Sequence, residues 1–391
     1  MNRLTAWLAM TVVACVVASQ AAGAAKTVQA RWAITDLGVL GTAYRDGSAS
    51  GINGLGQIVG GNGTAGGKQH AFLWQNGKLT DLRTLGGRDS GASAINGRGQ
   101  IVGTSLTAKP ERLHAFLWQD GKMTDLGTLG GRSSRPRAIN DQGQVVGESI
   151  TASGKPHAFL WQNGKLTDLG TLGGPTSDAL AINGHGQVVG ESATANGRTH
   201  AFLWQHGKML DLGTLGRRYT DSGAVAINDR GQVVGTSFEA TVTQTGRHGH
   251  AFLWQNGKIR DLGTLGGAYI DSDAVAINER GQIVGTSHAA SGKRRPVLWR
   301  NGKIVDLRGL GGGYSEAVAI DERGQVIGNS VPAGGALVHA FLWQNGKVTD
   351  LGTLGGQESE AAAINEHDQI VGVSNTKKGI RRAVLWALPN S

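Results

Sequence analysis

The sequence predicts an all-β protein: an eight-bladed β-propeller built from four-stranded antiparallel blades. One unit recurs eight times, and the Trp of its Leu-Trp pair returns every 43 to 50 residues. Each unit contains four short runs rich in Val, Ile, Phe and Trp, which are too short for helices and typical of strands. Four strands in a unit of this length indicate a propeller blade. The recurring residues are Trp74, Trp118, Trp161, Trp204, Trp254, Trp299, Trp343 and Trp386.

The second unit illustrates the expected elements. Its strands are expected at 93–96, 100–105, 114–119 and 122–127. The first two are joined by Asn-x-x-Gly, in which Asn bonds its own backbone and Gly takes a left-handed conformation. In the eighth unit Asp368 replaces that Gly. An Asn-Gly or Asp-Gly type turn joins the last two strands, as in a tight hairpin.

The two ends of the repeat region predict how the ring closes. Residues 32–38 form a lone fourth strand, and residues 381–388 form a third strand with no fourth strand behind it. The first strand can therefore complete the last blade and leave no exposed sheet edge. A stacked solenoid remains an alternative, although it does not need a blade divided between the two ends.

The repeated letters carry a resemblance. "HAFLWQNGKLTDLGTLGG" together with "AINxxGQVVG" resembles the HAF-repeat family of probable extracellular bacterial proteins, over nearly all of 32–386. The strand order is more distantly similar to WD40 blades. The first resemblance implies export and a repeat fold, and it implies no activity. Units seven and eight depart from it, with "RPVLW" and "RAVLW" in the third strand.

The N-terminus is typical of a signal peptide. One charge, Arg3, precedes the apolar run 4–18 and the small residues "SQAAGAA". We expect residues 1–24 to be the signal and 25–391 to be a single propeller in the periplasm or the medium. A membrane anchor and lipid attachment at Cys15 are the alternatives. Because Cys15 is the only cysteine, the mature chain has no disulfide or thiolate chemistry.

The composition favours an anionic partner. The formal net charge is +9, and a positive field attracts any polyanion. For an exported chain we expect an extracellular glycan or an envelope protein rather than nucleic acid. Solubility alone could also explain the charge.

The recurring His and Asp residues are expected to be structural pairs. With a two-residue turn at Asn76-Gly77, His70 lies diagonally beside Asp81 on one face of its hairpin. Two units carry Arg295 and Arg382 instead of His, and Arg pairs with carboxylates but is not a usual metal ligand. The sequence therefore predicts cation–carboxylate pairs, including Arg382 with Asp36, and no catalytic residue, cofactor or metal site.

The units differ mainly on one expected face, formed by connections between the second and third strands and between successive units. All four tyrosines lie there, beside arginines and carboxylates, and unit five adds the long loop 237–249. Aromatic rings can stack on sugars while charged groups take directed hydrogen bonds. The opposite face carries short turns and a recurring Lys, which we expect to be solvated. The predicted ligand-binding residues are Tyr44, Arg45, Arg217, Arg218, Tyr219, Asp221, Phe238, Tyr269, Asp271, Tyr314 and Glu316.

These observations predict an exported, non-enzymatic binding propeller. One alternative is a carbohydrate-active hydrolase or lyase that uses Asp221, Asp271 and Glu316, which would need two suitably spaced carboxylates. Another is a structural surface or adhesion array without a discrete site. Packing of the tyrosines against their own loops is the competing explanation for the variable face.

Overall fold

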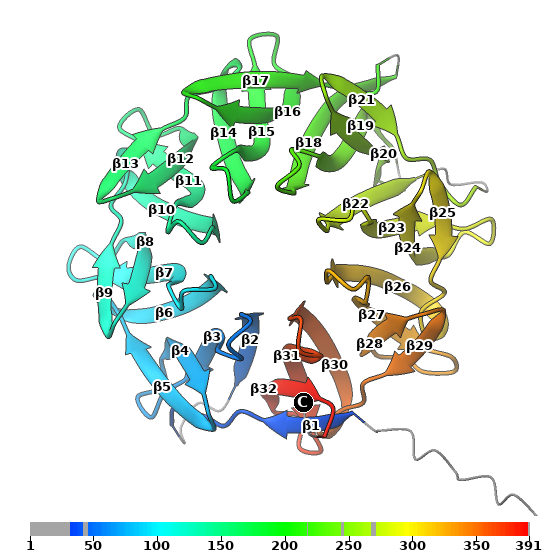
Figure 1. Cartoon of the computed structure of the whole chain (residues 1–391). Helices are drawn as coiled ribbons and strands as arrows, with labels where there is room; N and C mark the ends of the chain where they lie inside the picture. The colour runs from blue at the N-terminus through cyan, green and yellow to red at the C-terminus, as the bar shows by residue number, and fades with distance from the viewer. Residues whose placement is uncertain (1–31, 42–45, 217, 244–245, 267–270, 390–391) are drawn as a thin grey trace, which may run out of the picture. The chain divides into compact units, whose positions relative to one another are not determined.

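The computed structural model describes residues 32–41, 46–216, 218–243, 246–266 and 271–389. The unit 32–391 contains eight four-stranded antiparallel sheets arranged as an eight-bladed propeller (Figure 1). This confirms the predicted fold class. No helix occurs in the described residues, so none there is long and apolar enough to cross a lipid bilayer. The predicted signal peptide, residues 1–24, lies outside the described residues.

The strands of each blade run from the centre of the ring outward. The innermost strands are β2 (Gly47–Ile52), β6 (Gly86–Ile95), β10 (Gly130–Ile139), β14 (Gly173–Ile182), β18 (Tyr219–Ile227), β22 (Ser272–Ile277), β26 (Gly311–Ile320) and β30 (Gly355–Ile364). The second strands are β3 (Ile58–Gly63), β7 (Ile101–Thr107), β11 (Val145–Thr151), β15 (Val188–Thr194), β19 (Val233–Thr243), β23 (Ile283–His288), β27 (Val326–Pro332) and β31 (Gln369–Thr376).

The outer half of each blade carries the Leu-Trp pair and the recurring Asp. The third strands are β4 (Gln69–Gln75), β8 (Leu113–Gln119), β12 (Pro156–Gln162), β16 (Thr199–Gln205), β20 (Gly246–Gln255), β24 (Arg294–Arg300), β28 (His339–Gln344) and β32 (Arg381–Ala387). The outermost strands are β5 (Lys78–Arg83), β9 (Lys122–Asp125), β13 (Lys165–Asp168), β17 (Lys208–Gly213), β21 (Lys258–Asp261), β25 (Lys303–Asp306), β29 (Lys347–Asp350) and β1 (Ala33–Asp36). Blades 1 to 8 begin with β2, β6, β10, β14, β18, β22, β26 and β30.

The ring closes as the sequence predicts. Strand β1 pairs antiparallel with β32, with Ala33 opposite Ala387 and Asp36 opposite Val384, and so becomes the outermost strand of blade 8. The segment after β1 is held to blade 1, because the Asn62 amide donates to the Gly38 carbonyl at 3.0 Å and accepts from the Leu40 N–H. The two ends of the repeat therefore share one blade, which rules out an open solenoid.

The turns also adopt the predicted conformations. Asn76 and Gly77 both have positive φ, 51° and 77°, as a type I′ hairpin turn requires. Gly99 of the Asn-x-x-Gly turn has φ 77°, and Asp368 takes the same left-handed conformation with φ 57°. Asp tolerates this region because its short polar side chain bonds locally.

The innermost strands correct one expectation. The Gly-rich segments between units, expected to be loops, contribute most of their residues to the innermost strands. Strand β6, for example, already begins at Gly86, which lies opposite Thr107. Glycine is needed there for close approach: a Cβ on Gly87 would lie 2.5 Å from the Leu106 carbonyl oxygen. Tyr219, Asp221, Tyr314 and Glu316 consequently lie on strands and not on loops. The expected loop 237–249 is largely the hairpin of β19 and β20, which places Phe238 on β19.

The core consists of eight separate apolar clusters, one at each junction between adjacent blades. At the junction of blades 2 and 3, Leu117 and Leu126 pack against Val145 and Phe159, with Trp161 at the edge. Similar clusters occupy the other seven junctions. The recurring Trp residues belong to these clusters, so each packs between adjacent blades. Each blade thus depends on its two neighbours for burial.

A belt of Asn side chains links neighbouring blades directly after their innermost strands. The Asn96 amide donates to the backbone carbonyl of Asn140 in the next blade at 2.9 Å, and Asn140 donates in turn to Asn183. The belt continues to blade 7, where Asp321 replaces Asn and has no N–H to donate. There Arg323 binds Asp321 and, across the junction, Asp368 of blade 8 at 2.7 Å. A charged bridge therefore replaces the missing amide bond.

Candidate functional site

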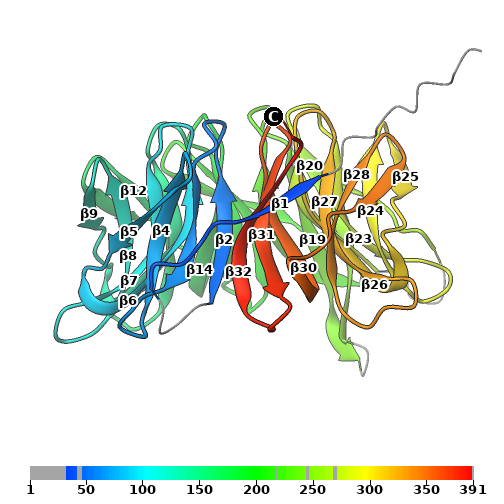
Figure 2. The ribbon, with the colours of Figure 1, turned by 90° about the horizontal axis from the view of Figure 1, so that it is seen from below.

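The two faces of the ring differ in how much their connections vary from blade to blade. We call the face with the tight turns, which join first to second and third to fourth strands, the turn face. We call the opposite one the loop face. On the loop face the β19–β20 hairpin extends well beyond the other blades (Figure 2). Blade 5, which contains this hairpin, is therefore the blade that departs furthest from the repeat.

At the root of this hairpin Arg218 and Tyr219 form a stacked pair. The Arg218 guanidinium lies 5.1 Å from the centre of the Tyr219 ring and donates to its hydroxyl at 3.0 Å. Arg218 also forms an ion pair with Glu239 of β19 at 3.0 Å, and it remains half exposed. The Tyr219 ring also lies beside the His250 ring, with ring centres 5.3 Å apart and the ring planes tilted by 43°. Burial raises the pKa of Tyr219.

Phe238 and Asp221 lie opposite one another in the same blade. Phe238 is partly buried, whereas Asp221 is 6% exposed. Asp221 accepts from the backbone N–H of Thr199 in blade 4 at 2.8 Å and from the Thr220 hydroxyl at 2.9 Å. Its carboxylate thus joins two blades. The sequence had predicted a ligand-binding role for this residue and not a structural one.

Asp271 of blade 6 has a similar role. Its carboxylate bonds His248 of blade 5 at 2.9 Å and accepts from the Gly249 N–H, which again joins adjacent blades. Asp89 of blade 2 takes the same position and accepts from the Gln69 N–H of blade 1. The recurrence of this contact indicates that the position serves assembly of the ring.

Tyr314 and Glu316 lie together on β26 in blade 7. The Tyr314 hydroxyl donates to the Glu316 carboxylate, and the Arg294 guanidinium of blade 6 lies 5.9 Å from the Tyr314 ring. Burial and the adjacent Glu316 carboxylate raise the pKa of Tyr314 to about 12. The structure thus gathers Arg218, Tyr219 and Phe238 in blade 5 and keeps Tyr314 with Glu316 two blades away.

Four of the predicted ligand-binding residues, namely Tyr44, Arg45, Arg217 and Tyr269, lie outside the described residues.

The predicted cation–carboxylate pairs are confirmed at seven positions. The His Nδ1 atoms lie 2.7–2.9 Å from Asp Oδ2 in His70–Asp81, His114–Asp125, His157–Asp168, His200–Asp211, His250–Asp261 and His339–Asp350. Arg382 pairs with Asp36 across the closure at 3.0 Å, as expected. Arg295 is the exception: its guanidinium donates to the Arg308 carbonyl at 2.6 Å instead of to a carboxylate. In the described residues no group of three or more His, Cys, Asp and Glu could hold a metal ion.

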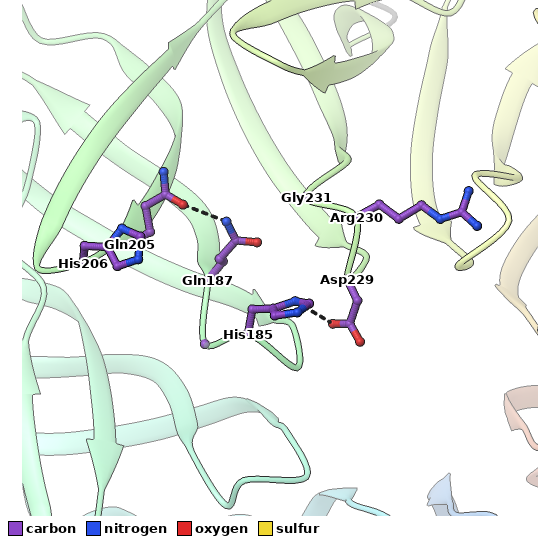
Figure 3. Close-up of a pocket in the computed structure, with 8 residues that line it drawn as sticks. His185, Gln187, Gln205, His206, Asp229, Arg230 and Gly231 are labelled. Carbon is purple, nitrogen blue, oxygen red and sulfur yellow. Dashed lines mark hydrogen bonds and ion pairs between the residues drawn. The ribbon is translucent and has the colours of Figure 1, made fainter.

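The turn face holds clefts that the sequence did not lead us to expect. One, of about 370 Å³, lies between blades 4 and 5 and is lined by His185, His206 and Arg230 (Figure 3). His185 lies 3.8 Å from Asp229, and Gln187 donates to Gln205 at 2.7 Å. A second cleft, of about 450 Å³, lies between blades 5 and 6 and is lined by Arg260, Arg280 and Arg300. Both of these clefts adjoin blade 5.

No protein-family model matches the sequence, and no curated protein matches it. The similarity to HAF-repeat proteins therefore stays a prediction. Several solved structures are similar at low identity. TolB from Acinetobacter baumannii is 12% identical with a TM-score of 0.38, over 73% of this chain and 78% of that one.

Two peptidases show a similar relationship. A puromycin-hydrolyzing peptidase from Mycobacterium tuberculosis is 12% identical, with a TM-score of 0.49, over 73% of this chain and 49% of that chain. The acylaminoacyl peptidase of Pyrococcus horikoshii is 11% identical, with a TM-score of 0.42, over 75% of this chain and 50% of that chain. At these TM-scores none of the similarities bears on what this chain binds or catalyses.

Proposed function

We propose that this chain is a non-enzymatic binding propeller that recognises an extracellular polysaccharide or envelope protein through its loop face. The proposed contact surface is the root of the β19–β20 hairpin, with Arg218, Tyr219 and Phe238 at its centre. Arg218 is half exposed and is held against the Tyr219 ring and Glu239, so a ligand meets an ordered cation beside an aromatic edge. Ordering before binding reduces the entropy lost on association.

The observation that carries the non-enzymatic part of the proposal is the bonding of three carboxylates. Asp221 is bonded to Thr199 and Thr220, Asp271 to His248, and Glu316 to Tyr314. A glycoside hydrolase typically uses one carboxyl group that donates a proton and another that acts as base or nucleophile. Carboxylates that already hold blades and strands together are poorly suited to either role.

Export is the second part of the proposal. It rests on the charged, apolar and small-residue order of 1–24, which is typical of a signal peptide. Mass spectrometry of the N-terminus, on protein recovered from outside the cytoplasm, tests it. Cleavage near residue 24 is the expected result, and an intact N-terminus on protein confined to the cytoplasm would refute export.

A binding screen tests the proposed surface. Residues 25–391 would be titrated with neutral and acidic polysaccharides by calorimetry, beside an Arg218→Gln/Tyr219→Ala variant. Arg112→Gln, which removes a cation from the same face in blade 2, is the matched control. We expect saturable binding that the double variant loses and the control keeps, without release of reducing ends. Binding that both variants retain would refute the surface, and release of reducing ends would refute the non-enzymatic reading.

A further inference from the structure

The cleft between blades 5 and 6 on the turn face has an unusual charge. Three arginines line it from three separate segments: Arg260 on β21, Arg280 in the turn between β22 and β23, and Arg300 at the end of β24. All three are exposed. Among the described residues, none of the three guanidinium groups forms an ion pair or a hydrogen bond.

Several arginines elsewhere in the ring are paired with carboxylates. Arg323 is bound by Asp321 and Asp368, Arg137 by Asp178, and Arg382 by Asp36. The one carboxylate that lines the cleft, Asp261, is already bonded to His250 and to the Gly263 N–H. The cleft therefore holds a surplus of positive charge that the fold itself does not use.

Two of these arginines are exceptions to the repeat. The residue before the recurring Asp is uncharged in the seven other units, and only here is it Arg260. The same is true of the residue after the recurring Trp, where Arg300 is the only charged residue. The two exceptions lie 40 positions apart in the chain and in different blades, yet they line the same cleft. The fold requires neither, because the other blades form without them.

The remaining lining suits a sugar. Leu253, Leu262 and Ile283 give the cleft an apolar floor that can contact sugar C–H groups. Side-chain amides of Gln232, Gln255 and Asn301 can bond hydroxyl groups, and Gln232 already donates to Gln255 at 3.2 Å. Trp299 is 4% exposed, and its indole N–H has no hydrogen-bond partner in the described residues.

We propose that this arginine cleft binds a carboxylated oligosaccharide, with Arg260 and Arg300 pairing with its carboxylates. The planar guanidinium matches a carboxylate through two parallel N–H···O bonds. Lys208, Lys258 and Lys303, on the turns of three consecutive blades of this face, extend the positive field along which an acidic chain would lie. Neither Arg218 nor Tyr219 lines the cleft, and the proposal does not rest on the one made for the Arg218–Tyr219 surface.

Calorimetry of residues 25–391 with oligogalacturonate and oligoalginate, at 50 and 150 mM salt, tests the cleft. The test variant is Arg260→Thr/Arg300→Gln, which introduces residues that most other blades carry at these positions. The control, Arg98→Gln/Lys122→Gln, removes the same charge from the turn face at blade 2. Fully methyl-esterified oligogalacturonate serves as the uncharged ligand.

We expect saturable binding of at least one acidic oligosaccharide, weakened at least tenfold in the test variant and less than twofold in the control. The methyl ester should not bind. Equal weakening of both variants would refute the cleft and indicate a diffuse positive field, and absence of acidic-sugar binding by the unmodified protein would also refute it. Loss of binding only in Arg218→Gln/Tyr219→Ala would refute the cleft while supporting the loop-face proposal.

Discussion

The junction of blades 2 and 3 and the junction of blades 5 and 6 have similar interiors and different surfaces. In both, an Asn amide crosses to the next blade at 2.9–3.0 Å, and an Ala N–H donates to a Ser hydroxyl of the next blade at 2.9–3.0 Å. On the surface, Thr124, Gln142 and Gln162 of the first junction correspond to Arg260, Arg280 and Arg300 of the second.

The comparison shows which positions do not take part in the assembly of the blades. Buried residues join the blades at both junctions, whereas the exposed guanidinium groups of Arg260, Arg280 and Arg300 join none. These three positions can therefore change without loss of assembly. Binding function can therefore accumulate at one junction while the others remain scaffold. If this is right, equivalent substitutions in the interiors should cost similar unfolding free energies, whereas substitutions on the surfaces should not have equivalent effects.

The largest expected effect concerns the interiors. Leu117→Ala and Leu253→Ala truncate corresponding side chains, 7% and 9% exposed, in the two junctions. Each should lower the free energy of unfolding by about 2–5 kcal/mol, because both leave a cavity between blades. Urea unfolding measures both. Costs that differ by more than about 2 kcal/mol would show that the two junctions are not equivalent.

A second effect on the free energy of unfolding is expected at the junction of blades 3 and 4, where Asp178 is paired with Arg137. Burial raises the pKa of Asp178 to about 6, despite its bond to Arg137, and Glu148 and Glu191 add repulsion. Because the folded pKa exceeds the unfolded value of 3.8, the fold should lose stability as pH rises from about 4 to about 6.

Asp178→Asn keeps an acceptor for Arg137 but has no charge to bury. Above pH 6 this variant should exceed the unmodified protein in unfolding free energy by on the order of 2 kcal/mol. Below pH 4 the two proteins should be equally stable. Urea unfolding across this pH range provides the check, and a pH-independent difference would contradict the explanation.

The junction of blades 7 and 8 should be more sensitive to one surface arginine than the other junctions. Arg323→Gln should lower the unfolding free energy by about 1–2 kcal/mol at pH 7, since it leaves the buried Asp321 carboxylate without its cation. Asp321→Asn/Arg323→Gln/Asp368→Gly, which introduces the Asn and the Gly that every other unit carries at the first and third of these positions, should recover the loss. Failure of this triple variant to recover would mean that the charged bridge does not replace the amide bond.

The loss of unfolding free energy in Arg323→Gln should also depend on pH. Burial raises the pKa of Asp368, but hydrogen bonds from Arg323 and Gln325 outweigh it, so the pKa of Asp368 is lowered overall. The bridge therefore stabilises the fold above the unfolded pKa, and its contribution should disappear as pH falls through the folded pKa. The difference between Arg323→Gln and the unmodified protein should shrink accordingly in acid.

The smallest effect is expected at the repeated pairs. His157→Gln should cost less than about 1 kcal/mol, because the Asp168 carboxylate is well exposed and also accepts from the Gly170 N–H. Ligand binding should be unchanged. If His157→Gln folded normally but lost binding, the recurring His residues would belong to a functional surface.

Much of the fold was predictable because the repeat fixes spacing and register together. A two-residue turn at Asn76-Gly77 places Phe72 opposite Asp81, and His70 then reaches Asp81. The closing strand and the Arg382–Asp36 pair follow from the same register. The Gly-rich starts of the innermost strands were not predicted. A run of glycines can indicate either a loop or a strand that lies very close to its neighbour, and the sequence does not distinguish the two.

The arginine cleft was not predictable from one unit. Arg260 and Arg300 belong to different blades, and contacts between blades leave no periodic signal within a single repeat. The available signal was a comparison of equivalent positions, which shows that each is the only charge at its place. Asp221 and Asp271 were predicted to bind a ligand for a related reason. Their actual partners, Thr199 and His248, come from the preceding blade, so one unit of the sequence does not show them.

Hydrogen exchange with and without oligogalacturonate is the most direct test of whether function resides at exceptions to the repeat. We expect added protection in 253–262, 280–283 and 299–303, and no change in the corresponding segments 117–126, 142–145 and 161–165 of blades 2 and 3. Protection spread equally over all blades, or absent from the junction of blades 5 and 6, would contradict the claim that this junction binds the ligand.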